Sequence, residues 1–196
     1  MNLILVRHGR PEAPTATAPT NPPLSAVGLT QAEITAVRLA GEPVTRIVSS
    51  GMRRADATAQ PLARRLAMPV ETHLRLGEVD RNGGHYASME TVRARGPEHW
   101  RRFLADPIGY FGVDGPAFIA EVTAGFAALL DGRGGTTVAF THGFPINILL
   151  AHTLGLAEIT RFIPDYASIT RLRGPTLDRL TVVSINETAH FAGEAA

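Results

Sequence analysis

The sequence contains no cysteine and no lysine, and both absences limit the chemistry that the protein can perform. Without cysteine there are no disulfides, no thiolate nucleophile and no cysteine-ligated zinc. Without lysine there is no Schiff-base chemistry and no phosphate-binding loop of the Walker type. All 19 basic residues are therefore arginines, and the net charge of +1 argues against broad binding to nucleic acids.

Long apolar runs are also missing, so we expect no membrane-spanning segment and no membrane partner. Apolar residues nevertheless make up 44% of the 196 residues, which is enough for the core of a folded domain. The apolar residues at the start of the sequence are too few for a signal peptide. We therefore expect a cytoplasmic globular protein whose residues 1–196 form a single domain.

Apolar periodicity predicts strands and helices that alternate along most of the chain. The expected strands are 3–6, 46–49, 70–76 and 136–140, followed by a hairpin of 169–173 and 180–185. The expected helices are 26–40, 52–66, 116–130 and 144–154, with Ser25 as an N-cap and Pro61 kinking or dividing the second helix. The first helix is expected to pack through Leu29, Ala32, Ala36, Val37 and Ala40.

This alternation predicts an α/β fold, a three-layer α/β/α sandwich whose central sheet is mostly parallel with an antiparallel edge. Residues 81–114 are less regular and include short helical patterns near 89–95 and 98–104. We expect them to form a small helical lid insertion that contributes to substrate specificity, with Trp100 packing within it.

Polar side chains follow three of the expected strands, at the point where each strand ends. They are Arg7-His8, Ser49-Ser50 and Thr141-His142. In open parallel sheets, ligands bind beyond the carboxyl ends of the strands. We therefore expect these three pairs to converge on one crevice.

The residues of this crevice suit the binding and transfer of a phosphoryl group. Arginines offer fork-shaped donors to phosphate, and Arg7 and Arg10 on either side of His8 would keep its imidazole neutral and nucleophilic. His8 would attack phosphorus and form a phosphohistidine, while Arg7 and Arg54 bind the phosphoryl oxygens. His142, if protonated, would add a third cationic donor.

The proton for the leaving group requires an acid, and Glu78 is the expected one, with Asp80 as the fallback. A carboxyl group near a dianionic phosphate has a raised pKa, which an acid working near neutral pH needs. The same residues, Glu78, Asp80, His8 and His142, form a conceivable metal ligand set, but no HxH, HxxxH or HExxH spacing occurs and arginines repel cations. We therefore expect neither a metal nor a cofactor.

Six motifs occur in an order that resembles the histidine phosphatase superfamily, the phosphoglycerate-mutase-like proteins. They are LVRHG at 5–9, PLSAVGLTQA at 23–32, SSGMRRADATA at 49–59, LGE at 76–78, THG at 141–143 and NETAH at 186–190. The resemblance implies that His8 is the nucleophile and Glu78 the acid. It also implies that Arg54, rather than Arg53, binds phosphate, and that His142 is the second histidine of the site.

The sequence departs from this family at three places around the substrate pocket. Pro14 stands where many members have a phosphate-binding asparagine, GGHYA at 83–87 replaces a GxWEG motif, and DGPA at 114–117 replaces GGES. His85 and Tyr86 within this stretch are candidates for substrate contact. The departures leave the phosphoryl chemistry intact and leave the identity of the substrate open.

The sequence therefore favours a metal-independent phosphatase that hydrolyses small phosphomonoesters through a phosphohistidine. A mutase acting on phosphoglycerates or sugar phosphates is the alternative within the family, although residues 81–114 are compact for a mutase. A regulatory protein that binds phosphorylated ligands with little turnover is the alternative of another class. The oligomeric state stays open, a homodimer included.

Overall fold

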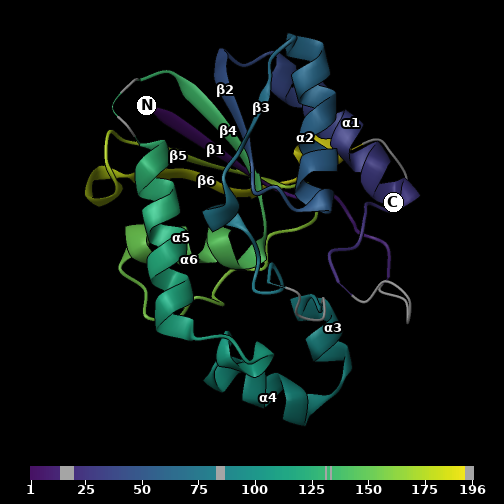
Figure 1. Ribbon diagram of the computed structural model, residues 1–196, viewed down its shortest axis with the longest axis vertical. Coiled ribbons are helices and arrows are strands. Elements are labelled where there is room, and N and C mark those ends of the chain that lie inside the picture. Colours follow the sequence, from purple (N-terminus) through teal and green to yellow (C-terminus); the bar gives the residue numbers. More distant parts are fainter. Residues whose placement is uncertain (14–19, 83–86, 131, 133, 193–196) are drawn as a thin grey trace.

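The computed structural model describes residues 1–13, 20–82, 87–130, 132 and 134–192. Among these residues the strands form one six-stranded sheet in the order β3-β2-β4-β1-β5-β6 (Figure 1). Their bounds are β1 (Asn2–Arg7), β2 (Val44–Ser49), β3 (Val70–Thr72), β4 (Thr136–Thr141), β5 (Ile169–Arg173) and β6 (Thr181–Glu187). Strands β1 to β4 pair in parallel, and β5 and β6 add an antiparallel edge beside β1. The expected mostly parallel sheet and terminal hairpin are confirmed.

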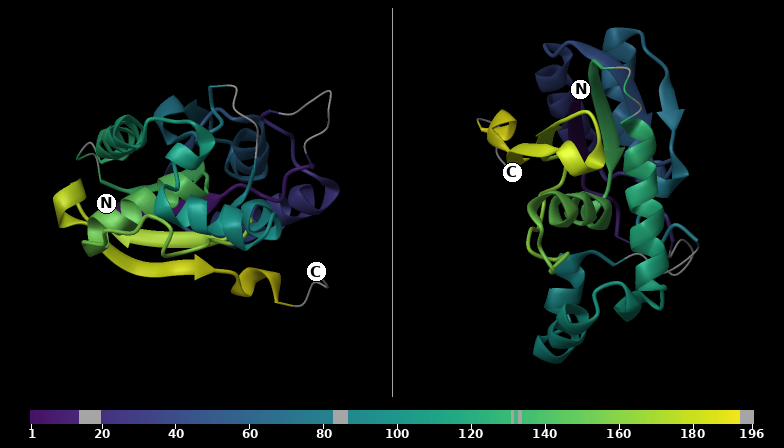
Figure 2. Two further views of the ribbon diagram at one scale, coloured as in Figure 1. Left: turned by 90° about the horizontal axis from the view of Figure 1, so that it is seen from below. Right: turned by 90° about the vertical axis from the view of Figure 1, so that its left-hand side faces the viewer.

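Helices cover both faces of this sheet, so the expected three-layer α/β arrangement is also confirmed (Figure 2). Because side chains alternate along a strand, Leu3 and Leu5 of β1 face one core while Ile4 and Val6 face the other. The helices α1 (Ala26–Ala40) and α2 (Arg53–Leu66) pack on the side of Ile4 and Val6. The helices α5 (Gly115–Leu129) and α6 (Gly143–Leu154) pack on the side of Leu3 and Leu5.

Helix α1 begins as expected, because the hydroxyl of Ser25 accepts a hydrogen bond from the N–H of Gly28. The expected packing face of α1 is wrong in part, since Leu29 and Val37 are 53% and 59% exposed. The buried face consists of Gly28, Ala32, Thr35, Ala36 and Leu39. Most of these side chains are small, which allows α1 to approach α2 closely.

Two other expectations need correction. The strand predicted over 70–76 ends at Thr72: the N–H of His73 makes a last ladder bond to Ser49 O, and residues Leu74–Leu76 then form a 3-10 turn. Pro61 does not divide its helix: α2 runs without interruption across it and buries its ring. The proline removes one backbone hydrogen bond, and burial of its ring offsets part of that loss.

Two short helices, α3 (Met89–Ala94) and α4 (Pro97–Ala105), extend away from the sheet (Figure 1). They match the helical segments expected near 89–95 and 98–104. Phe103 of α4 and Phe111 of the following 3-10 turn contact Phe144 at the start of α6, with ring centroids 6.1 and 6.0 Å apart. Trp100 stacks on Phe103 as expected. These aromatic contacts join the two helices to the rest of the molecule.

No helix among the described residues combines the length and the apolar character needed to cross a membrane.

Candidate active site

The three polar clusters that follow β1, β2 and β4 meet at one edge of the sheet. The N–H of His8 donates to Thr141 O at 2.9 Å, which continues the parallel pairing of β1 with β4 by one residue. The rings of His8 and His142 consequently lie 5.0 Å apart. The hydroxyl of Ser50 lies 2.8 Å from Nε2 of His142. The expected convergence of these clusters is confirmed.

His8 is positioned as a neutral imidazole with a defined tautomer. Its Nδ1 lies 2.8 Å from the carbonyl oxygen of Gly9, which only accepts hydrogen bonds, so Nδ1 carries the proton. Its Nε2 accepts a hydrogen bond from Nε of Arg54 at 3.3 Å and therefore bears the lone pair. Burial, followed by the charges of Arg54 and Arg7, holds the pKa of His8 well below its ordinary value.

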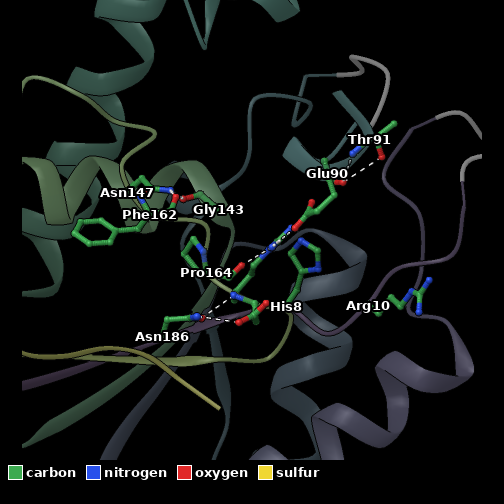
Figure 3. A network of polar contacts seen from close by, with 12 residues as sticks. His8, Arg10, Glu90, Thr91, Gly143, Asn147, Phe162, Pro164 and Asn186 are labelled. Carbon is green, nitrogen blue, oxygen red and sulfur yellow. Dashed lines mark hydrogen bonds and ion pairs between the residues drawn. The ribbon is translucent and has the colours of Figure 1, made fainter. Parts of the chain in front are cut away.

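The second arginine of the RHGR tetrapeptide does not belong to the site. Arg10 is exposed, and Figure 3 shows it apart from His8, so Arg7 and Arg54 are the cations that act on the imidazole.

Glycine is required at position 9 because the backbone of Gly28 approaches it closely, and not because the backbone there adopts a left-handed conformation. A Cβ atom at Gly9 would lie 2.5 Å from Gly28 O, and one at Gly28 would lie 2.1 Å from Arg10 O. The first turn of α1 thus packs directly on the backbone that follows His8.

Arg54, in the first turn of α2, is fully buried beside His8. Its Nη2 and Nη1 donate to the two carboxylate oxygens of Asp80 at 2.8 and 3.2 Å, which is a bidentate pair. Arg53, the neighbouring residue, is exposed. Asp80 therefore holds the guanidinium of Arg54 in place, a role that the sequence did not indicate.

Glu78 lies next to this pair, and its two oxygens accept hydrogen bonds from the backbone N–H groups of Phe144 and Val79 at 3.2 and 3.0 Å. Burial and the charge of Asp80 raise the pKa of Glu78 from 4.5 to about 7, against the opposing charge of Arg54 and the two backbone hydrogen bonds. Burial and Asp80, two causes that the sequence analysis did not name, thus shift this pKa in the direction that an acid near neutral pH needs.

His142 is completely buried at the N-cap of α6. Burial, followed by the charges of Arg54, His8 and Arg7, lowers its pKa well below the ordinary value, so the imidazole is neutral in the ligand-free site. The expectation of a protonated His142 is wrong for this state. Its Nδ1 has no hydrogen-bond partner within the described part of the chain. The N-terminus of α6 directs a partial positive charge toward the same place.

Arg7 at the end of β1 is 3% exposed and is held by residues that the sequence analysis did not identify. Its Nη1 donates to Pro164 O and, at 3.2 Å, to the carboxylate of Glu90 on α3 (Figure 3). The ring of Tyr166 stacks on its guanidinium at 4.0 Å. Burial alone would raise the pKa of Glu90, but Arg7 and the Ser88 hydroxyl together lower it below its ordinary value. No motif marks these partners, because they approach from loops and from α3.

Other candidate residues lie outside this cluster or outside the described residues. Pro14, His85 and Tyr86 belong to the residues that the structure does not describe. His190 contacts the hydroxyl of Thr35 on α1 and therefore packs the C-terminal end of the chain. In the described ranges, no three His, Cys, Asp or Glu side chains are grouped so that they could hold a metal ion.

A separate cavity of about 320 Å³ lies between α3, α4 and the 3-10 turn that follows them. Its described lining consists of Ala87, Arg95, His99, Arg102, Tyr110 and Phe111. The Tyr110 hydroxyl lies 2.9 Å from Nδ1 of His99 and accepts from Arg95 at 3.4 Å. The polar groups around this cavity are therefore basic or neutral.

The buried cluster combines the elements of an anion-binding and group-transfer site. Two guanidinium groups and a helix N-terminus can bind negative charge, a neutral imidazole can act as a nucleophile, and burial and Asp80 raise the pKa of a carboxyl group to about 7.

Comparisons with known proteins agree with this arrangement. The family model of the histidine phosphatase superfamily (branch 1) matches residues 3–188. Phosphoserine phosphatase 1 of Hydrogenobacter thermophilus is 27% identical over 97% of this chain and 94% of its own length. The Proteus mirabilis protein named "Probable phosphoglycerate mutase GpmB" is 28% identical over 92% of this chain and 84% of its own.

Solved structures share the fold. A mycobacterial glucosyl-3-phosphoglycerate phosphatase superposes with a TM-score of 0.72 at 23% identity, over 95% of this chain and 99% of the other. The alpha-ribazole phosphatase of Shigella flexneri superposes with a TM-score of 0.70 at 20% identity, over 95% and 96%. Because the family model spans nearly the whole sequence, the chain belongs to the histidine phosphatase superfamily, branch 1.

Proposed function

We infer that the protein is a phosphatase that hydrolyses phosphomonoesters without a metal ion, through a phosphohistidine at His8. The observation that carries this proposal is the hydrogen bonding of the imidazole: Nδ1–H is fixed on Gly9 O, and the lone pair of Nε2 faces Arg54. A neutral imidazole oriented in this way is a nucleophile, and cations around it bind the group that it attacks.

In the first step Nε2 of His8 attacks phosphorus, and the bond from phosphorus to the ester oxygen breaks. Arg54 keeps its proton, and its Nε–H now donates its hydrogen bond to a phosphoryl oxygen instead of to Nε2. Arg7, His142 and the N-terminus of α6 bind the other oxygens. Glu78 gives its proton to the departing alkoxide. The N-phosphoimidazolium that forms keeps its Nδ1–H on Gly9 O, which stabilises the positive charge.

In the second step a water molecule loses a proton to the Glu78 carboxylate and attacks phosphorus. The bond between phosphorus and Nε2 breaks, which releases inorganic phosphate and restores neutral His8 and protonated Glu78. Each group thus returns to its starting state. A pKa of about 7 suits Glu78 to both roles, because acid and base forms are then both populated near neutral pH.

The surroundings of the phosphate site support a substrate that carries a second negative group. Ala87, at the edge of the basic cavity, is three residues from Glu90, so their Cα atoms are at most about 11 Å apart. Glu90 itself contacts Arg7. A carboxylate or second phosphate on a small phosphoester would therefore find Arg95, His99 and Arg102 beyond the reaction centre. Residues 81–114 would then act as the substrate-specificity lid.

A mutase is the second candidate, favoured by the similarity to the Proteus mirabilis protein. The two activities differ in what accepts the phosphoryl group from His8: water in a phosphatase, and a second organic hydroxyl in a mutase.

The test combines turnover with trapping of the intermediate. Wild-type protein is assayed on a panel of phosphoesters with a chelator present, and the phosphoenzyme is labelled and analysed without acid, which hydrolyses phosphohistidine. We expect turnover to inorganic phosphate with label on His8, and neither with His8→Ala. Wild-type rates in His8→Ala, or label only on His142, would contradict the mechanism. Binding without turnover of any ester would favour a regulatory binder.

A further inference from the structure

The segment that joins α6 to β5 is attached to Arg7 and His8 by several hydrogen bonds, of which Figure 3 shows the one at Pro164. The backbone N–H of Arg7 donates to Ser168 O at 3.2 Å, and the N–H of Ala167 donates to His8 O at 3.1 Å. Pro164 O accepts from the guanidinium of Arg7. The segment therefore follows the backbone of both residues and also contacts a side chain that faces the phosphate.

Tyr166, at the centre of this segment, contacts the side chains of both residues. The guanidinium carbon of Arg7 lies 4.0 Å from the centroid of its ring, and the ring of His8 lies 5.6 Å away at 47°. An arginine stacked on an aromatic face is attracted by the ring and keeps its N–H groups in the guanidinium plane, where they bind oxygen atoms. Tyr166 thus restricts the direction in which Arg7 presents its donors.

The backbone around Tyr166 is held in a conformation that requires support. Ala167 is fully buried and has a φ of +57°, which lies in the left-handed region of backbone conformation. This conformation costs a residue with a Cβ atom about 1 kcal/mol or more. The support comes from Asn186 at the end of β6, whose side chain accepts from Asp165 N at 2.7 Å and donates to its carboxylate at 2.8 Å. Strain that is maintained beside a reaction centre is typical of a functional constraint.

We propose that Tyr166 is a positioning residue that orients Arg7 for the phosphoryl group, with Asn186 holding the segment that carries it. This inference rests on the proposed function only in assigning phosphate to Arg7. Tyr166 itself takes no part in bond making or breaking. Its effect reaches the substrate through the guanidinium, so it disappears when that guanidinium is removed.

The experiment is a double-mutant cycle with Tyr166→Leu and Arg7→Ala, measured by the affinity for vanadate and by kcat/KM for para-nitrophenyl phosphate. We expect Tyr166→Leu to lower both quantities about tenfold in the wild-type background, between the scales of exposed and desolvated cation–π contacts, because Arg7 is buried and Tyr166 half-buried. In the Arg7→Ala background we expect less than about a twofold effect. Tyr166→Phe, which keeps the aromatic face, should retain activity within about twofold of wild type.

The matched control is Phe118→Leu on α5, which removes another aromatic ring that contacts a guanidinium, that of Arg81 at 4.8 Å. It should leave the affinity for vanadate unchanged. Thermal unfolding of every variant verifies that the proteins are folded.

Two results would overturn the proposal. One is a Tyr166→Leu effect of equal size with and without the Arg7 side chain, which would indicate a general structural role. The other is a loss in Tyr166→Phe as large as in Tyr166→Leu, which would assign the effect to the hydroxyl. Vanadate binding measures both of these outcomes. The proposed function fails in a different measurement, in which neither phosphohistidine nor turnover is detected.

Discussion

Substitution of Glu78 by Gln gives the most direct test of the charge arrangement in this site. A carboxyl group with a pKa of 4.5 is protonated in about 1 molecule in 300 at pH 7, whereas one with a pKa of about 7 is protonated in about half. Burial and Asp80 therefore increase the population of the acid about 150-fold at neutral pH. Glu78→Gln keeps the size of the side chain and removes the proton that the proposed mechanism gives to the leaving group.

The expected loss depends on the leaving group. An alkyl phosphate releases a strongly basic alkoxide, so its kcat/KM should fall by about 10²–10⁴ in Glu78→Gln, the usual scale of general acid catalysis. Para-nitrophenolate needs little protonation, and its ester should lose far less. For the wild type acting on alkyl phosphates, kcat/KM should fall about tenfold per pH unit above pH 7, because the acid form of Glu78 is depleted.

The assay is a set of pH profiles of kcat/KM for both ester types. The fall in kcat/KM above pH 7, the basic limb of the profile, should vanish in Glu78→Gln. In Asp80→Asn it should move to lower pH, because loss of a neighbouring negative charge and release of Arg54 both lower the pKa of Glu78. Equal losses for both esters, or an unchanged basic limb in Glu78→Gln, would refute the assignment.

Three further predictions concern binding and stability. Arg54→Ala should lower both the affinity for phosphate and the rate by at least about tenfold, because it removes a buried charge-assisted donor, whereas the control Arg53→Ala should leave both unchanged in the same assay. Vanadate should inhibit more strongly than sulfate in competition assays, because it becomes five-coordinate on His8; equal inhibition would leave an anion site without in-line transfer. Below pH 6.5 each of His8 and His142 should lower the free energy of unfolding by up to about 1.4 kcal/mol per pH unit, because their pKa values are depressed only in the folded protein and the unfolded chain takes up the protons. The raised pKa of Glu78 has the opposite sign and offsets about one of these two contributions between about pH 7 and 4.5, so a net fall remains. Denaturant titrations should show a flatter pH dependence for His142→Gln, and an unchanged slope would mean that the buried His142 is not a source of this pH dependence.

The sequence predicts the convergence of the polar clusters well because they follow strands. A buried strand is recognisable from its apolar run, and parallel strands end at one edge of the sheet, so Arg7-His8 and Thr141-His142 meet wherever the strands pair. Short-range signals are similarly reliable, as the Ser25 cap of α1 illustrates.

The partners of the arginines could not be predicted in this way. Asp80, Glu90 and Tyr166 reach their arginines from loops and a short helix, whose directions depend on packing rather than on local sequence. The protonation of His142 was also mispredicted, because residue type and spacing do not reveal that a side chain is fully buried.

The contact between Gly9 and Gly28 has a consequence for how tolerance to mutation is interpreted. A methyl group at Gly28 would meet Arg10 O at 2.1 Å and would displace the turn that carries His8. A deep mutational scan would therefore rank Gly28 beside His8 among the least replaceable positions, although Gly28 lies on α1 and reaches the reaction only through packing. Intolerance to substitution at this position measures how closely a helix approaches a backbone, and it carries no information about contact with substrate.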